Sequence, residues 1–293
     1  MGKRNNKKRK SWIVPLTAAV VVAMFGTYWL GPSRPVEIRQ RDLEGIIRRN
    51  ASIEKMIPGS SGRVYLIAQE HHYAGTTREG KDPNAKQQDS LPLIQSEIYH
   101  LLHDLCKEAK LSLVIGEGLG PKELVLPYEQ KGFSKSNWEE HRAGMNDKAF
   151  SVNFLHSNPK ETGYTLLEFF HPDLVTSFGA NDSIHLSELS KIERGLFDLA
   201  LKYIPTRTDY ENPEKRRLLR EAEMPLNDRK AQLNDERSII YLNEGIARAD
   251  ELKKEDIAIV IGASHIPLMA KKYSGKRTLY VICPKSAAPV KLD

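Results

Sequence analysis

The sequence has little cysteine, and its cysteines form no metal-binding or redox motif. There are two in 293 residues, Cys106 and Cys283, and neither belongs to a C-x-x-C or zinc-knuckle spacing. Cys106 lies in an apolar helical pattern and Cys283 ends an apolar strand pattern. We therefore expect two buried thiols. A pair of cysteines is also compatible with a disulfide outside the cytosol.

The chain also lacks net charge outside its first ten residues. These hold six of the 44 basic residues and no acidic one, which leaves 38 basic residues against 38 acidic ones in the rest of the chain. A protein that binds nucleic acid needs an excess of positive charge on one face. The balance therefore predicts that nucleic acid is not a partner.

Charge is absent again from residues 12–30, which read WIVPLTAAVVVAMFGTYWL. About 20 apolar residues in a helix cross the hydrocarbon layer of a membrane, and the basic flank stays on the cytoplasmic side. The pattern predicts a cytoplasmic head (1–11), a transmembrane signal anchor (12–30), a linker (31–38) and one α/β domain (39–293). This prediction makes the protein a single-pass membrane protein with an extracytoplasmic domain.

A cleaved signal peptide is the alternative interpretation of residues 12–30. Signal peptides have a shorter apolar region and a site of small residues after it. Here the apolar region ends on Tyr28, Trp29 and Leu30, which are bulky. The sequence favours the anchor.

Within the domain, three apolar runs predict buried central strands: Val64–Ile67, Leu111–Ile115 and Ile257–Ile261. An amphipathic helix between the first two, at Leu93–Lys110, gives a βαβ unit and hence a parallel pair. The remaining pattern predicts two more strands, at Leu174–Phe178 and Leu279–Cys283. It also predicts four more helices, at Val36–Ile57, Leu186–Ile204 and Pro213–Leu252 and from Ile266. The fold class is α/β, with a mainly parallel central sheet covered by helices.

Ionisable residues follow four of the predicted strands. They occur in the segments AQEHH (68–72), GEG (116–118), GAND (179–182) and GASH (262–265). Ligands bind at the carboxyl ends of strands in such sheets. Histidines and carboxylates that meet there are what a metal site or a general acid–base pair requires. The sequence therefore predicts one shared cleft.

These motifs, in this order, resemble the superfamily that groups the TraB and Tiki proteins with ChaN-like and erythromycin esterase-like proteins. The resemblance covers Val64 to Met269. It implies an α/β fold and, in several branches, metal-assisted or acid–base hydrolysis. The residues that match the family's motifs, and that it implies as catalytic, are His71, Glu117, Asp182, Arg237 (in the pair Glu236-Arg237) and His265.

The first motif departs from the family pattern at two positions. Ala68 replaces a glycine, and Gln69 stands where ChaN-like and esterase members have glutamate. Glu70 comes one residue later, and a shift of register makes His72 the matching histidine. Glu70 and His72 are therefore secondary candidates.

Three hypotheses for the function follow. In the first, the protein is a hydrolase of the peptidase or esterase type, acting on a peptide or a small molecule. Its His71, Glu117 and His265 bind a divalent metal ion or activate water, and Arg237 holds a substrate carboxylate or an oxyanion. In the second, the cleft binds haem or another cofactor without chemistry, which Gln69 favours. In the third, the protein is an interaction protein of the same fold.

Overall fold

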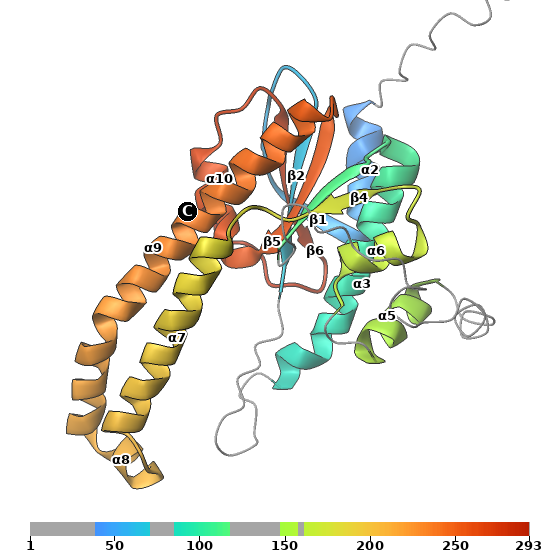
Figure 1. Cartoon of the computed structure of the whole chain (residues 1–293). Coiled ribbons are helices and arrows are strands. Elements are labelled where there is room, and N and C mark those ends of the chain that lie inside the picture. Colours follow the sequence, from blue (N-terminus) through green and yellow to red (C-terminus); the bar gives the residue numbers. More distant parts are fainter. Residues whose placement is uncertain (1–38, 71–84, 118–146, 158–160, 293) are drawn as a thin grey trace, which may run out of the picture. The chain divides into compact units, whose positions relative to one another are not determined.

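A six-stranded sheet with the order β1-β6-β2-β5-β3-β4 forms the centre of the structure (Figure 1). In this computed structural model the described residues are 39–70, 85–117, 147–157 and 161–292. The strands are β1 (Ala51–Ile57), β2 (Arg63–Gln69), β3 (Leu113–Gly116), β4 (Thr176–Phe178), β5 (Asp256–Gly262) and β6 (Thr278–Pro284). All neighbours pair in parallel except β1, which runs antiparallel to β6. The prediction of a mainly parallel sheet is confirmed, and the sheet is mixed because of β1.

Helices cover both faces of the sheet (Figure 1). One face carries α9 and α10, and the other carries α2, α3 and α6. The helices are α2 (Gln40–Asn50), α3 (Ala85–Ala109), α5 (Asp147–Ser157), α6 (Gly163–Phe170), α7 (Ser183–Tyr203), α8 (Arg207–Glu211), α9 (Pro213–Glu251) and α10 (Ile266–Lys272), with a short 3-10 turn η2 (Ala263–His265). Residues Gln40–Asp293 make one compact unit.

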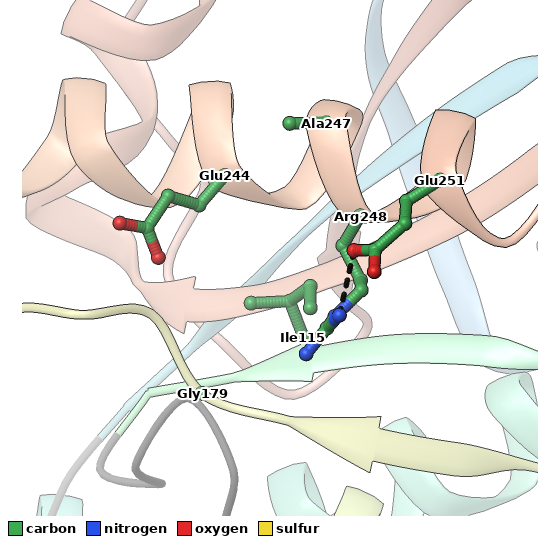
Figure 2. A pocket seen from close by; sticks show the side chains of 6 residues that line it. All are labelled: Ile115, Gly179, Glu244, Ala247, Arg248 and Glu251. Carbon is green, nitrogen blue, oxygen red and sulfur yellow. Dashed lines mark hydrogen bonds and ion pairs between the residues drawn. The ribbon is translucent and has the colours of Figure 1, made fainter.

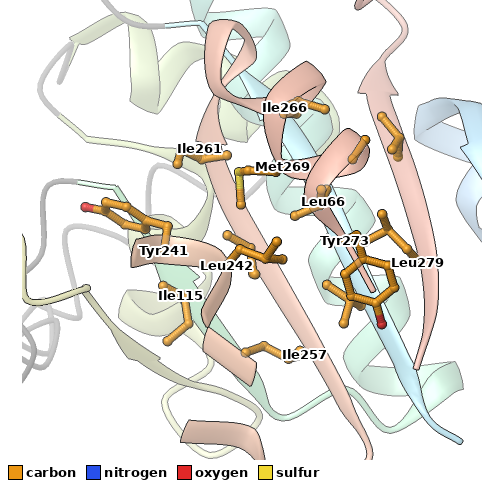
Figure 3. Packing of buried hydrophobic residues seen from close by; sticks show 14 of the residues in the cluster. Leu66, Ile115, Tyr241, Leu242, Ile257, Ile261, Ile266, Met269, Tyr273 and Leu279 are labelled. Atoms are coloured by element: carbon orange, nitrogen blue, oxygen red, sulfur yellow. The ribbon is translucent and has the colours of Figure 1, made fainter. Parts of the chain in front are cut away.

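The core explains why β2 and β5 read as continuous apolar runs. After its first residue each strand is fully buried, because side chains on both faces meet helices. On one face Leu66 and Ile257 pack with Leu242 of α9 and Met269 of α10 (Figure 3). Each such side chain contributes about 1.5–3 kcal/mol when it is buried. This packing fixes the strand ends, and therefore the residues that follow them.

The segment Val36–Ile57 does not form the single helix that its apolar spacing predicts. Helix α2 buries Leu43, Ile46 and Ile47 and ends at Asn50. The chain then extends as β1, which pairs with β6 along the edge of the sheet. Backbone pairing with a neighbouring strand outweighs the local spacing here, which is a tertiary effect.

The expected membrane-spanning helix is not found in the part of the chain that the structure describes. Within the described ranges, no helix is both long enough and apolar enough to cross a membrane. Helices α3, α7 and α9 have the length, at 25, 21 and 39 residues, but charged residues recur along each of them. This finding contradicts the prediction of a signal anchor and of an extracytoplasmic single-pass protein. Residues 12–30, on which that prediction rests, lie outside the described residues.

Glu168 of α6 is a buried acid, and its charged form lowers the stability of the folded protein. Its side chain is 7% exposed. Burial raises the pKa of Glu168 above its usual value of 4.5, and the neighbouring Ser177 offsets only part of this effect. Folding therefore favours the protonated form of Glu168 more than the unfolded chain does. The raised pKa of Glu168 contributes to the free energy of unfolding in full below pH 4.5, and this contribution is lost as the pH rises through the raised pKa.

Glu168→Gln is consequently expected to raise the free energy of unfolding at about pH 7, because glutamine keeps the shape and removes the charge. The gain should fall toward zero below pH 4.5, where the wild-type side chain is neutral as well. Urea unfolding at several pH values measures both. Glu255→Gln, at an exposed position, is the control. A variant no more stable than the wild type at neutral pH would contradict the prediction.

Candidate functional site

Glu117 lies at the centre of the site, directly after β3. Its main-chain N–H donates to Val260 O of β5 over 3.1 Å, and Tyr164 Oη donates to its main-chain oxygen over 2.5 Å. Its side chain is 12% exposed, and Oε2 accepts the N–H of Gly262 over 2.8 Å. Backbone and side chain are thus both held, so the carboxylate has one fixed orientation.

Arg237 of α9 binds two carboxylates from two different strand ends. Its Nε donates to Asp182 Oδ2 over 2.9 Å, and its Nη2 donates to Glu117 Oε1 over 3.2 Å. Asp182 stands at the N-cap of α7 but makes no capping hydrogen bond with its side chain. An arginine that faces the interior needs an acidic partner, because an unpaired buried charge is very costly. Arg237 has two such partners.

The ion pairs hold Arg237 in its charged form. Burial lowers the pKa of Arg237, but the hydrogen bond to Asp182 and the charges of Glu117 and Asp182 outweigh it, and the net pKa is raised. The guanidinium side chain is 8% exposed, and Asp182 is 3% exposed. Removing one partner of such a buried group leaves an uncompensated charge. Arg237 therefore fixes β3, β4 and α9 relative to one another.

His265 completes the cluster from the turn after β5. Its Nε2 lies 3.7 Å from Glu117 Oε1. Its Nδ1 lies 2.8 Å from Ser238 Oγ and 3.2 Å from the main-chain oxygen of Asn234. A carbonyl oxygen only accepts, and Ser238 Oγ itself donates to Asn234 O over 2.7 Å. The proton of the neutral ring is thus assigned to Nδ1, and Nε2 faces Glu117.

Of the other predicted site residues, only Glu70 lies in the described part of the chain, and its side chain contacts the segment after β6. His71 and His72 lie outside the described residues. Glu70 lies at the carboxyl end of β2, where its Oε1 accepts the N–H of Ala288 over 3.3 Å. Gln69 is 1% exposed and pairs in register with Gly262 of β5. Of the five catalytic candidates, the structure brings together Glu117, Asp182, Arg237 and His265.

The predicted metal-binding group is not found among the described residues. In the residues that the structure describes, no three His, Cys, Asp or Glu side chains are placed to hold an ion. Glu117 and His265 converge, but the same Glu117 oxygen binds the guanidinium of Arg237. A dication there would meet a fixed positive charge at close range. The described donor set does not fit a metal ion, and His71, the third predicted ligand, lies outside it.

A small cavity lies between α9 and the ends of β3 and β4, and no residue of the cluster lines it (Figure 2). Its volume is about 200 Å³. Its lining consists of Ile115, Gly179, Glu244, Ala247, Arg248 and Glu251. Glu244 accepts the N–H of Asn181 over 2.7 Å, and Arg248 binds Glu251 over 2.6 Å. The space is smaller than the roughly 300–1,000 Å³ of a typical ligand pocket.

Sequence reasoning misses three residues that build the site. Ser238 and Asn234 orient His265, and Tyr164 binds the backbone of Glu117. A signal for Ser238 is present, because a serine four residues after Asn234 in a helix donates to that carbonyl. No comparable signal exists for Tyr164, since its position depends on how α6 packs.

Comparisons with known proteins identify no relative: no family model, curated protein or solved structure matches the chain. The resemblance to the TraB/Tiki and ChaN-like group therefore stays a prediction.

Proposed function

We propose that Glu117, Arg237 and His265 form the catalytic centre of a hydrolase that works by general acid–base catalysis. The observation that supports this most is the orientation of His265. Its Nδ1 side is held by α9, and its Nε2 faces a fixed carboxylate. General-base catalysis uses a histidine whose one ring nitrogen is held by hydrogen bonds, so that the other nitrogen has a fixed direction in which to accept a proton.

In the proposed reaction, His265 Nε2 takes a proton from water while the water oxygen attacks the carbonyl of an ester or amide. The proton then passes from the imidazolium to the leaving group. Glu117 stabilises the imidazolium, because its Oε1 lies 3.7 Å from Nε2. Arg237 is a positioning residue, since Asp182 and Glu117 engage its guanidinium. In this proposal Arg237 does not hold a substrate carboxylate or an oxyanion, which is the role expected from the sequence.

Hydrolysis of p-nitrophenyl acetate and of a mixed fluorogenic peptide library tests the proposal. His265→Asn is expected to lower kcat/KM by about 10²–10⁴-fold, the usual contribution of a general base. His156→Asn is the matched control, because His156 is exposed on α5 and belongs to no part of the cluster. Circular dichroism confirms that both variants are folded.

The outcomes separate the hypotheses. Activity that survives in His265→Asn at the wild-type level refutes the acid–base role. Loss of activity in both histidine variants points to a general defect, which also refutes the assignment to this site. A wild-type protein without activity on either probe removes the support for a hydrolase and favours the non-catalytic ligand-binding alternative.

A further inference from the structure

The segment after β6 crosses the carboxyl end of the sheet without forming a helix or strand. We call residues 285–292 the strap. At its start, Ser286 N and Oγ donate to the two oxygens of Glu97 on α3, over 2.8 and 2.9 Å. Farther along, Val290 and Leu292 pack against the cluster that includes α9 and α10. The strap therefore passes from the α3 face to the α9 and α10 face.

The middle of the strap is fixed at Ala288. Its N–H donates to Glu70 Oε1 over 3.3 Å, and its carbonyl accepts from Cys283 Sγ over 3.2 Å. Glu70 follows Gln69, and Gln69 pairs with Gly262, whose N–H holds Glu117. The strap thus covers the end of β2, beside the catalytic cluster.

The strap is held more weakly than the elements around it. Glu97 is buried, at 4% exposure, but no residue of 285–292 is fully buried. A few hydrogen bonds and three half-buried apolar side chains, Ala287, Val290 and Leu292, are its described contacts with the core. Segments of this kind open at a small fraction of the free energy of global unfolding.

We propose that the strap is a releasable cover that opens and closes the β2 side of the catalytic cluster. When it is closed, Ala288 engages Glu70 and covers Cys283. When it opens, the end of β2 becomes accessible from solvent while the sheet stays folded. The control of substrate access rests on the proposed function, whereas the opening itself does not.

The two cysteines report on the opening. Cys283 is 1% exposed under the strap, and burial together with Glu54, Glu70 and Glu97 raises its pKa to about 11. Cys106 is buried in α3, where burial raises its pKa to about 12. A thiol reacts with alkylating reagents as the thiolate, so both are protected in the closed state. Strap opening exposes Cys283, and global unfolding exposes both.

Alkylation of the native full-length chain with N-ethylmaleimide, followed by peptide mass spectrometry, measures the two rates separately. Cys283 is expected to react at least tenfold faster than Cys106. Glu97→Gln weakens the hydrogen bonds to Ser286. It is expected to raise the alkylation rate of Cys283 by about a further tenfold and to leave that of Cys106 unchanged. Ala288→Pro removes the N–H that binds Glu70 and should act in the same direction. Lys291→Gln, at an exposed strap position, is the control.

Equal rates for Cys283 and Cys106, shifted together in every variant, would overturn the proposal, because the strap would then leave only when the protein unfolds. The access role has its own readout. If the hydrolase is active on p-nitrophenyl acetate, Ala288→Pro should raise kcat/KM. An unchanged kcat/KM with faster labelling of Cys283 would keep the opening and refute the access role. Failure of the hydrolase assay leaves the labelling result intact.

Discussion

Arg237→Met is expected to lower the free energy of unfolding by about 3–5 kcal/mol, the usual cost of removing one partner from a buried ion pair. Methionine fills most of the volume of the arginine side chain but supplies no charge. Asp182 and Glu117 then remain as carboxylates at 3% and 12% side-chain exposure without their shared cation. Urea unfolding followed by circular dichroism measures the loss.

Arg229→Met on the same helix is the matched control. Arg229 binds Glu188 of α7 over 2.8 Å, so it too joins α9 to α7 through a carboxylate. Its side chain is 36% exposed and that of Glu188 is 39% exposed. A pair with this exposure contributes about 0–1 kcal/mol. The contrast between the two variants therefore isolates the effect of burial.

A double variant tests the cause of the loss. If unpaired carboxylates destabilise Arg237→Met, then Asp182→Asn should cost less in the Arg237→Met background than in the wild type. The two changes are coupled because the groups touch, at 2.9 Å. Strictly additive effects, or a loss in Arg237→Met no larger than that in Arg229→Met, would show that this cluster does not hold β3, β4 and α9 together.

The strands that are buried on both faces could be predicted, because their sequences are apolar throughout. The runs at 64–67 and 257–261 are apolar at every position, and both correspond to interior strands, β2 and β5. The run at 51–57 could not be predicted as β1. Ile53 and Ile57 are four residues apart, which also suits a helix, and only the partner strand β6 decides the matter.

The residues of the site could be predicted more easily than their interactions. Glu117, Asp182 and His265 follow strand ends, and parallel strands place those ends at one edge of the sheet. Arg237 comes from the middle of a 39-residue helix, and its inward direction depends on the register of α9 against β5. The tautomer of His265 depends on the carbonyl of Asn234, which no side-chain pattern encodes.

Tyr164 connects the packing of α6 to the position of Glu117. Its hydroxyl donates to Glu117 O. Its ring lies so close to Gly116 that a Cβ on Gly116 would be 2.4 Å from a ring carbon. This position requires α6 to approach α3 closely. Gly163, the first residue of α6, makes the approach, and its N–H donates to Gln95 Oε1 over 2.8 Å.

Gly163→Ala is therefore expected to lower the free energy of unfolding by about 2–3 kcal/mol, at the upper end of the usual cost of overpacking. A Cβ at this position would lie 2.4 Å from the main-chain oxygen of Gln95 and 2.8 Å from the Cβ of Ile98. Both atoms belong to the body of α3, so neither can rotate away. Helix α6 has to move, and Tyr164 moves with it.

Gly45→Ala is the matched control, because it makes the same substitution in α2. A Cβ on Gly45 meets no atom within 4 Å. Alanine there should stabilise the protein by about 0.5–1 kcal/mol, through the lower backbone entropy of the unfolded chain and the better helix propensity. The two substitutions thus have opposite expected signs, and chemical unfolding of both variants measures them. Equal stabilisation by both would mean that α6 does not pack against α3 at this distance. In that case the contact between Tyr164 and Glu117 would lose its structural basis.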